Sequence, residues 1–274
     1  MAVITINRDS YSMGKVIAEG LASELGYKCI GDEVFAATSK GFGIAETKIR
    51  SALEDAPTFW GIPLTTRSKL ISCYQSTLAR LLLDDNVVYY GPAGHLLIQG
   101  VSHVLKVYLQ SDIEARVQLK AKTEDITGGK ALKKLLKEDK GHSKLTSFLY
   151  GINGNEEGLC DMVINTGKAG MKDVIRTISV QALSKRYRTT TYSVNCLKNI
   201  ELSFRVRAAL IDVDRDVSVR AASGSVFIHA RATEGKRQKL VDTVRNAAKS
   251  IRDVANVEVI ITEDIFERYA ETYR

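Results

Sequence analysis

The first twenty-six residues place a short apolar run and a helical stretch on either side of a polar loop. Residues 3–6 are apolar or β-branched and predict a buried strand. Apolar side chains then recur at helical spacing between Val16 and Leu25, and Gly26 is placed to end that helix. The loop between the two elements lies where a mononucleotide-binding fold holds phosphate, on backbone N–H groups and the positive end of a helix.

Apolar runs and helical stretches continue to alternate as far as residue 185. Residues 33–60 predict short helices, because Gly41, Gly43 and Pro57 interrupt the helical spacing. Further strands are predicted at residues 27–32, 87–90, 104–109 and 161–166, and further helices at residues 70–83, 112–122, 130–139 and 171–185. Strands that alternate with helices favour an α/β fold with a parallel sheet and right-handed crossovers.

The pattern changes after a polar, basic stretch at residues 184–191, which we interpret as a linker or an edge strand. Beyond it, helices are predicted at residues 197–211 and 236–252, and strands at residues 217–219, 226–228 and 257–261. The turn at residues 223–225, Ser-Gly-Ser, is a hairpin signal. We therefore expect two domains, at residues 1–188 and 189–274, the second a small α+β unit. Its three-stranded sheet would have open edges, from which we expect self-association.

The bulk composition limits the possible partners without choosing one. The net charge of +7 suits an anionic ligand such as a nucleotide, nucleic acid or acidic lipid, but a mildly basic surface explains it equally well. The four cysteines and four histidines are scattered, so we expect no metal site. We find no segment typical of a signal peptide or a membrane span, and expect a cytoplasmic protein. Basic residues surround Tyr187, yet a charged linker explains them better than nucleic-acid binding does.

The polar loop carries only part of a phosphate-binding motif. The strict motif is a glycine, four residues, Gly-Lys, and then Ser or Thr. Asp9 stands at the first glycine, and Val16 replaces the hydroxyl that would ligate magnesium. The scaffold therefore favours nucleotide binding, while the side chains argue against an ordinary kinase. We assign no catalytic residue, and the candidate phosphate-binding residues are Arg8, Ser10, Ser12, Gly14, Lys15 and Val16.

The order of these segments resembles the cytidylate kinase-like family of P-loop nucleoside monophosphate kinases over about residues 1–183. The matching pieces are residues 4–8, 12–14, 17–18, 25–26, 87–91, 107–109 with Arg116, and 161–166. The resemblance implies a nucleotide triphosphate on the first loop, a mobile lid at residues 117–150 and a monophosphate acceptor side at residues 32–67. The implied ligand is an adenine or cytosine nucleotide such as ATP, ADP, AMP or CMP, with Mg²⁺ if phosphate is transferred. Possible acceptor-side and lid residues are Asp32, Arg116, Lys133 and Lys137.

The chain departs from that family at the positions that handle phosphate. Tyr11 and Met13 stand where small glycines approach the phosphates, and Gly14 falls where the catalytic lysine is expected, with Lys15 one place on. The lid of the family usually supplies arginines that clamp the transferring phosphate, whereas residues 117–150 contain eight lysines and no arginine. These lysines either neutralise phosphate or form a solvated helix face.

The C-terminal residues 196–262 are similar to a BON domain in their pattern of strands and apolar positions. BON domains are usually exported and are thought to contact lipids or small ligands, but here a sensing or assembly module is the expectation. Three functions remain open for the whole chain. It is a nucleotide-binding regulatory or sensor protein, an active nucleoside monophosphate kinase that phosphorylates CMP or dCMP with ATP, or a non-enzymatic scaffold without nucleotide binding.

Overall fold

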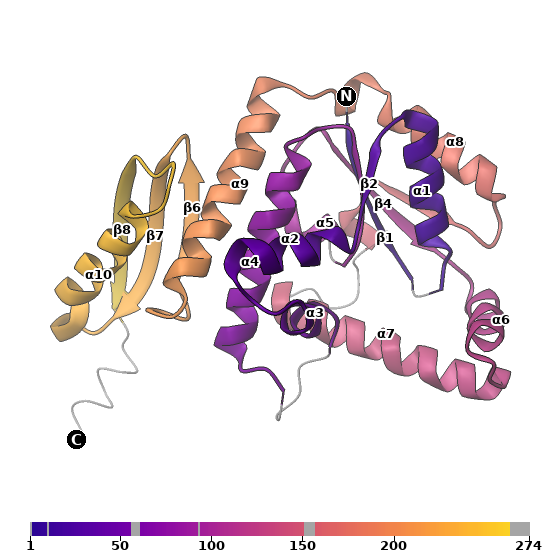
Figure 1. The fold of residues 1–274 in the computed structure, drawn as a ribbon, viewed down its shortest axis with the longest axis horizontal. Helices are drawn as coiled ribbons and strands as arrows, with labels where there is room; N and C mark the ends of the chain where they lie inside the picture. Colours follow the sequence, from indigo (N-terminus) through magenta and orange to yellow (C-terminus); the bar gives the residue numbers. More distant parts are fainter. Residues whose placement is uncertain (1, 10, 56–60, 93, 151–156, 264–274) are drawn as a thin grey trace.

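The central sheet has five parallel strands, which are β1 Val3–Arg8, β2 Lys28–Ile30, β3 Val87–Tyr90, β4 Val104–Gln110 and β5 Met162–Asn165. The computed structural model describes residues 2–263 apart from 10, 56–60, 93 and 151–156 (Figure 1). The strand order is β2-β3-β1-β4-β5, and Val3 of the central strand lies opposite both Val87 and Val104. The parallel sheet predicted from the alternating pattern is confirmed.

Helices cover both faces of this sheet, which is therefore the middle of three layers (Figure 1). One face carries α1 Gly14–Leu25 and α8 Met171–Ala182, and the other carries α2 Glu33–Phe42, α3 Glu46–Glu54, α4 Leu64–Leu82 and α5 Gly94–Leu97. Successive side chains of β1 point alternately to the two helical layers. Ile4 and Ile6 pack with α1 and α8, whereas Val3 packs with α2–α5. A strand buried on both sides reads as one apolar run, as residues 3–6 do.

A hairpin of two helices, α6 Ile113–Glu124 and α7 Gly128–Tyr150, projects beyond the carboxyl ends of the strands (Figure 1). We call residues 113–150 the lid hairpin. Its second helix runs below the sheet and reaches α3. This helix is longer than the predicted residues 130–139, because the helix continues through Gly141. One glycine inside a helix costs only about 1 kcal/mol relative to alanine.

The C-terminal module contains α9 Thr191–Leu210, β6 Ser218–Ala222, β7 Ser225–Ala232, α10 Arg237–Lys249 and β8 Asn256–Glu263. Its sheet has the order β6-β7-β8, with β6 antiparallel and β8 parallel to the central β7. The predicted hairpin is confirmed, and its turn has positive φ at Ser223 (50°) and Gly224 (83°). Positive φ at both central residues is the geometry of a type I′ turn, which matches the twist of the strands.

Residues 184–190 connect α8 to α9, so the edge-strand alternative predicted for residues 184–191 was wrong. The segment forms a short 3₁₀ turn, η2 Lys185–Tyr187, and then the N-cap of α9. Thr190 and Ser193 form a reciprocal capping box, in which the Ser193 N–H donates to Thr190 Oγ1 at 3.1 Å, so α9 begins well before the predicted Leu197. Tyr187 is 2% exposed and packs in the core with α1 and α8, so its ring is not free to stack on a base.

Helix α9 contributes to two hydrophobic cores. Leu197 is buried in the core around α4, while Leu202 and Val206 belong to the core of the C-terminal module. Two side-chain bonds join α9 to α4: Ser76 Oγ donates to Glu201 at 3.0 Å, and Arg207 Nη1 donates to Ser72 Oγ at 2.7 Å. The helix that opens the predicted second domain is therefore also part of the first.

None of the described helices combines the length and the apolar character that crossing a bilayer requires.

Candidate functional site

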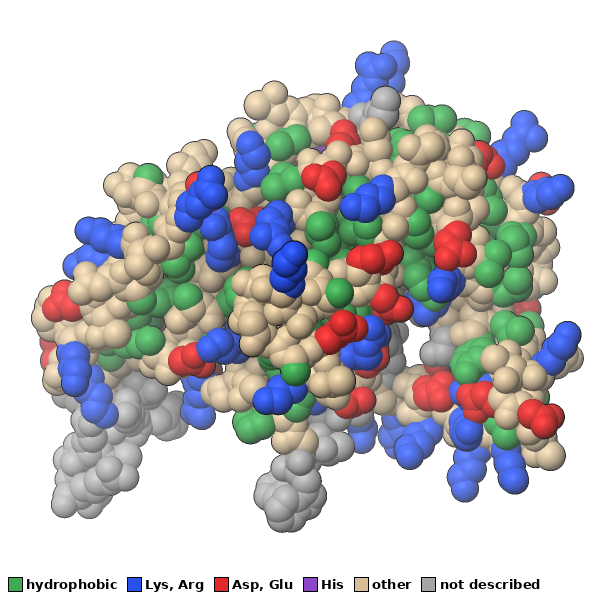
Figure 2. Space-filling view, viewed as in Figure 1, with side chains coloured by type: hydrophobic (Ala, Val, Ile, Leu, Met, Phe, Trp, Pro, Cys, Tyr) green, Lys and Arg blue, Asp and Glu red, His purple; other side chains and the backbone are tan. Residues whose placement is uncertain are grey.

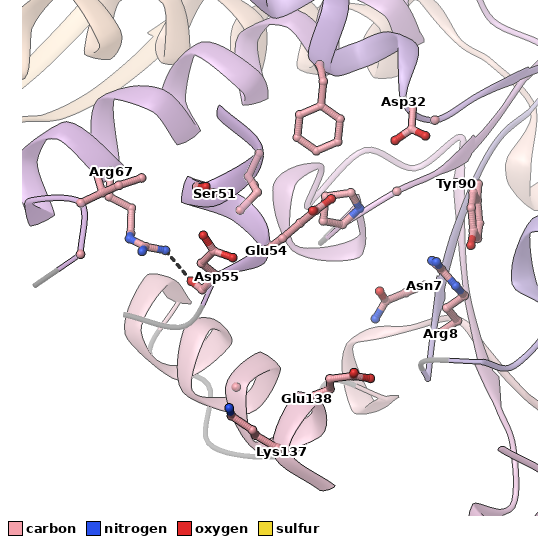
Figure 3. Close-up of a pocket in the computed structure, with 18 of the residues that line it drawn as sticks. Asn7, Arg8, Asp32, Ser51, Glu54, Asp55, Arg67, Tyr90, Lys137 and Glu138 are labelled. Carbon is pink, nitrogen blue, oxygen red and sulfur yellow. Dashed lines mark hydrogen bonds between the residues drawn. The ribbon is translucent and has the colours of Figure 1, made fainter. Parts of the chain in front are cut away.

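A cavity of about 1000 Å³ opens at the carboxyl ends of β1, β2 and β3 (Figure 3). In open parallel sheets, ligands bind at this end, where the strand order reverses direction. The ends of β1–β3 and the residues after them supply one wall, α2–α4 a second, and α7 of the lid hairpin a third. Charged residues of both signs line it, together with Tyr90 and Phe35; they are Arg8, Asp32, Glu54, Asp55, Arg67, Lys134, Lys137 and Glu138.

Arg8 is the last residue of β1 and lies across the beginning of α1. Its guanidinium is 4.0 Å from the centre of the Tyr90 ring. Burial lowers the pKa of Arg8, whereas nearby tyrosine and carboxylate groups raise it. A Cβ atom on Gly14 would stand 2.3 Å from Cδ of Arg8, so only glycine leaves room for this side chain. Arg8 therefore covers the first residue of α1 and brings a cation into the cavity.

The phosphate-type loop keeps left-handed backbone at two residues that are not glycine. Tyr11 has φ 61° and Met13 has φ 60°, at the positions where the family resemblance predicts glycines. Such backbone costs about 1–2 kcal/mol for an ordinary residue. The Tyr11 hydroxyl donates to Glu124 Oε1 of α6 at 2.7 Å, and Lys120 Nζ lies 4.3 Å from the Tyr11 ring centre. The loop is thus bonded to the lid hairpin by its own side chain.

The other loop candidates are not directed into the cavity. Lys15 is exposed and lies 3.9 Å from Glu19 on the outer surface of α1, and Val16 next to it is 48% exposed. Ser12 is buried and donates to the Asp9 carbonyl at 2.8 Å. Ser10 lies outside the described residues. Of the five loop candidates that the structure describes, only Arg8 lines the cavity.

The carboxylate of Asp9 is held by β4 and the residue after it. The Tyr108 hydroxyl donates to it at 2.8 Å and the Ser111 N–H at 3.0 Å. The Asp9 carboxylate is thus already engaged, and Val16 offers no oxygen for Mg²⁺ in the position of the motif's hydroxyl. Among the residues that the structure describes, no three His, Cys, Asp or Glu side chains come together as a metal site requires.

The acceptor side is organised around Arg50 rather than around the predicted Asp32 alone. Arg50 donates to Asp32 at 3.1 Å and to Glu54 at 3.2 Å, and its guanidinium lies 4.1 Å from the Phe35 ring centre. Burial raises the pKa of Glu54, and Arg50 opposes that rise. Asp32 does line the cavity, and it shares Arg50 with two further carboxylates, Glu46 at 3.1 Å and Glu54, so the cluster keeps a net negative charge.

Arg67 is a site residue that the sequence analysis missed. Its side chain is 2% exposed, and Nη1 donates to the carbonyl of Ala52 at 2.9 Å. Nη1 also donates to the carbonyl of Asp55 at 2.8 Å (Figure 3). It therefore fastens the end of α3 to α4 at the cavity wall. A signal was present, because Arg67 is in phase with the buried Ile71 and Tyr74 at spacings of four and seven residues. A lone cation within an apolar helical stripe predicts a buried, hydrogen-bonded charge.

Two lysines of the lid hairpin are paired with acids of the same hairpin. Lys120 is 1% exposed and contacts Glu124 at 2.7 Å and Glu138 at 2.8 Å, and Lys134 contacts Glu124 at 2.7 Å. Lys120, with Lys134 and Tyr11, lowers the pKa of Glu124 to about 2. Figure 2 shows the basic side chains that project from the outer edge of the lid hairpin.

The predicted lid residues have different positions. Arg116 contacts Asp139 at 2.6 Å and so joins α6 to α7, without lining the cavity. Lys137 faces the cavity, whereas Lys133, one helical turn earlier, is exposed outside it. Of the four predicted acceptor-side and lid residues, Asp32 and Lys137 line the cavity.

Known proteins share this fold and part of this sequence. A model of the cytidylate kinase-like family matches residues 3–168. A cytidylate kinase of Thermococcus sibiricus is 32% identical over 95 residues, or 35% of this chain and 48% of that protein. A cytidylate kinase of Sulfurisphaera tokodaii is 26% identical over 95 residues, or 35% of this chain and 52% of that protein. The chain spans about half the length of the curated relatives it matches.

Among solved structures, an uncharacterized protein from Eubacterium ventriosum is similar, with a TM-score of 0.50 and 15% identity. The similarity covers 68% of this chain and 100% of that one. At this identity the likeness concerns the fold alone. It agrees with a parallel five-stranded sheet and flanking helices.

Proposed function

This chain belongs to the cytidylate kinase-like family, and from that premise we propose that it is a nucleotide-binding regulatory or sensor protein rather than a kinase. The ligand is an adenine or cytosine nucleotide, bound in the cavity at the carboxyl ends of β1–β3. Nucleotide binding follows from the family, and the loss of catalysis follows from the loop. The observation that carries the proposal is the bond between Tyr11 of the loop and Glu124 of the lid hairpin.

The cavity has the size and chemistry for a nucleotide. Its volume of about 1000 Å³ is at the upper end of the range for small-ligand sites. Arg8 and Lys137 bring cations for phosphate, and Tyr90 and Phe35 bring aromatic surface for a base. Lysine binds phosphate as a point charge, without the bidentate geometry of arginine. These groups suit recognition of a nucleotide better than stabilisation of a transferring phosphate.

Phosphoryl transfer needs several features that this loop lacks. In P-loop enzymes the loop N–H groups and a lysine cradle the phosphates, and a lid closes over them. Here Tyr11 fills a glycine position and bonds to α6, Lys15 faces outward, and Val16 offers no oxygen for a metal. We therefore expect negligible ATP-dependent phosphorylation of CMP, dCMP, UMP or AMP.

Calorimetric titration with ATP, ADP, AMP and CMP tests binding, and a coupled assay tests transfer. Lys137→Ala is expected to lower the affinity for the bound nucleotide by about tenfold, which corresponds to the loss of one hydrogen bond to a charged group. Lys133→Ala, one turn away and outside the cavity, is the matched control and should change affinity less than about twofold. Turnover near one per second or above, which is about the low end for enzymes, would establish the active kinase instead. If none of these nucleotides binds, the third possible function, a non-enzymatic scaffold without nucleotide binding, is the one that remains.

The C-terminal module is proposed as the sensing or assembly part, on its similarity to a BON domain and its strand order. Among the described residues, no further strand pairs with the outer edge of β6 or β8, and an uncovered edge is a template for another chain. We propose a homo-oligomer that uses this edge. Ile260 of β8 is 40% exposed, so Ile260→Lys should lower the mass seen by light scattering at tens of micromolar. Val180→Lys on α8, which is 66% exposed, is the control, and dissociation by that change alone would move assembly to the first domain.

A further inference from the structure

A second cavity, of about 690 Å³, lies between the first domain and the C-terminal module. It is formed where α4 and α9 run side by side, with α5, β6 and the 3₁₀ turn η1 Glu157–Leu159 completing its walls (Figure 1). Most of its lining residues are apolar, and they include Ile71, Leu96, Leu97, Leu159, Ile200 and Phe204. Its volume is within the range of small-molecule sites, which lie preferentially at domain interfaces.

A buried amide with no partner faces this cavity. The Gln75 side chain is 5% exposed and lines the cavity, and it makes no hydrogen bond within the part of the chain that the structure describes. An amide directed into a largely apolar space has room for a partner that enters from outside the chain.

One charged side chain accompanies that amide. Among the described lining residues, Arg207 alone is ionised at neutral pH. Its guanidinium is held in place, since Nη1 donates to Ser72 Oγ at 2.7 Å and Nε donates to the Val217 carbonyl at 3.2 Å. An immobilised cation beside an apolar wall complements a molecule with an apolar body and one negative group.

We propose that this second cavity binds a small amphipathic anion, such as an aromatic or aliphatic carboxylate or sulfonate. Its apolar body lies against Phe204 and Leu97, its anionic group faces Arg207, and Gln75 bonds to a polar atom along its length. The same helix, α4, forms a wall of both cavities, with Arg67 at the first and Ser68 at the second. A ligand here is therefore placed to act on the first cavity as an effector.

Calorimetric titration of the full chain with 1-anilinonaphthalene-8-sulfonate tests the proposal. This probe has an aromatic body and one sulfonate, and we expect saturable binding of one molecule per chain. Ser68→Trp fills the cavity and should weaken the probe by about tenfold or more, since packed space does not accept a ligand. Thr66→Trp, an exposed position on the same helix outside the cavity, is the matched control and should bind within about twofold of wild type.

A second variant tests the hydrogen-bonding role of Gln75 without filling the cavity. Gln75→Met keeps the length of the side chain, removes both hydrogen-bonding groups and should weaken the probe about fivefold, as for one neutral hydrogen bond. This variant decides the question if Ser68→Trp does not fold by circular dichroism. No saturable binding at millimolar probe, or equal affinities for the Ser68→Trp and Thr66→Trp proteins, overturns the proposal. No nucleotide is present, so this result is independent of nucleotide binding at the first cavity.

Discussion

Replacement of Arg67 by methionine is expected to lower the free energy of unfolding by about 3 kcal/mol. The side chain is 2% exposed, and Nη1 holds the carbonyls of Ala52 and Asp55 at 2.9 and 2.8 Å. Hydrogen bonds from a charged donor contribute about 1.5–3 kcal/mol each, so the two together contribute about 3–6 kcal/mol. Burial lowers the pKa of Arg67, which shows that desolvation opposes its charge, and methionine removes that penalty. The lower end of the range is therefore expected.

Urea denaturation followed by circular dichroism measures this loss, and a thermal scan should show a midpoint lower by about 6–12 °C. Arg67→Lys keeps the charge but not the fork, and should retain about half of the stabilisation. Arg80→Met is the control on the same helix, because Arg80 is exposed and has no ion pair among the described residues; it should cost less than about 0.5 kcal/mol. A loss below about 1 kcal/mol for Arg67→Met, or one equal to the control, would refute the role of Arg67 as the fastening between α3 and α4.

Three further outcomes can be measured with single variants. The Tyr89 hydroxyl lies 2.8 Å from that of Tyr74 and donates to the Pro92 carbonyl at 3.0 Å, so it bridges the two groups. In urea denaturation Tyr89→Phe should therefore cost about 2 kcal/mol and Tyr74→Phe about 1 kcal/mol. Equal costs would contradict this bridging role of Tyr89. Gly14→Ala places Cβ 2.3 Å from Arg8 Cδ, and should destabilise by about 1–3 kcal/mol in the same assay; an unchanged midpoint would show that Arg8 moves freely. Burial raises the pKa of Cys73 to about 11, so the thiol stays protonated at pH 8, and mass spectrometry after iodoacetamide should find it unlabelled until denaturant is added; rapid labelling of the native protein would disagree with its burial.

The alternating pattern was enough to predict most of the fold, whereas the contacts that shape the site join distant residues. β1 and α1 followed from apolar spacing, and the turn at Gly224 from its composition, because each depends on neighbouring residues. The bond from Tyr11 to Glu124 spans 113 residues, and nothing local to either residue indicates it. The capping box at Thr190 was readable and was overlooked, since the polar, basic stretch before it suggested a linker. Lys15 lies 3.9 Å from Glu19, one helical turn further along the exposed side of α1.

Residues 70–79 of α4 are all buried, which leaves that stretch of the helix without a solvent face. An ordinary surface helix is amphipathic, and this one is not, because α9 covers the side that would otherwise meet water. A protein with the same sheet but no α9 would need polar residues along that side of α4. The C-terminal module therefore cannot be replaced by an unrelated module joined at the loop between α8 and α9. Its loss would uncover apolar surface on the first domain, and heat should melt both parts in one cooperative transition.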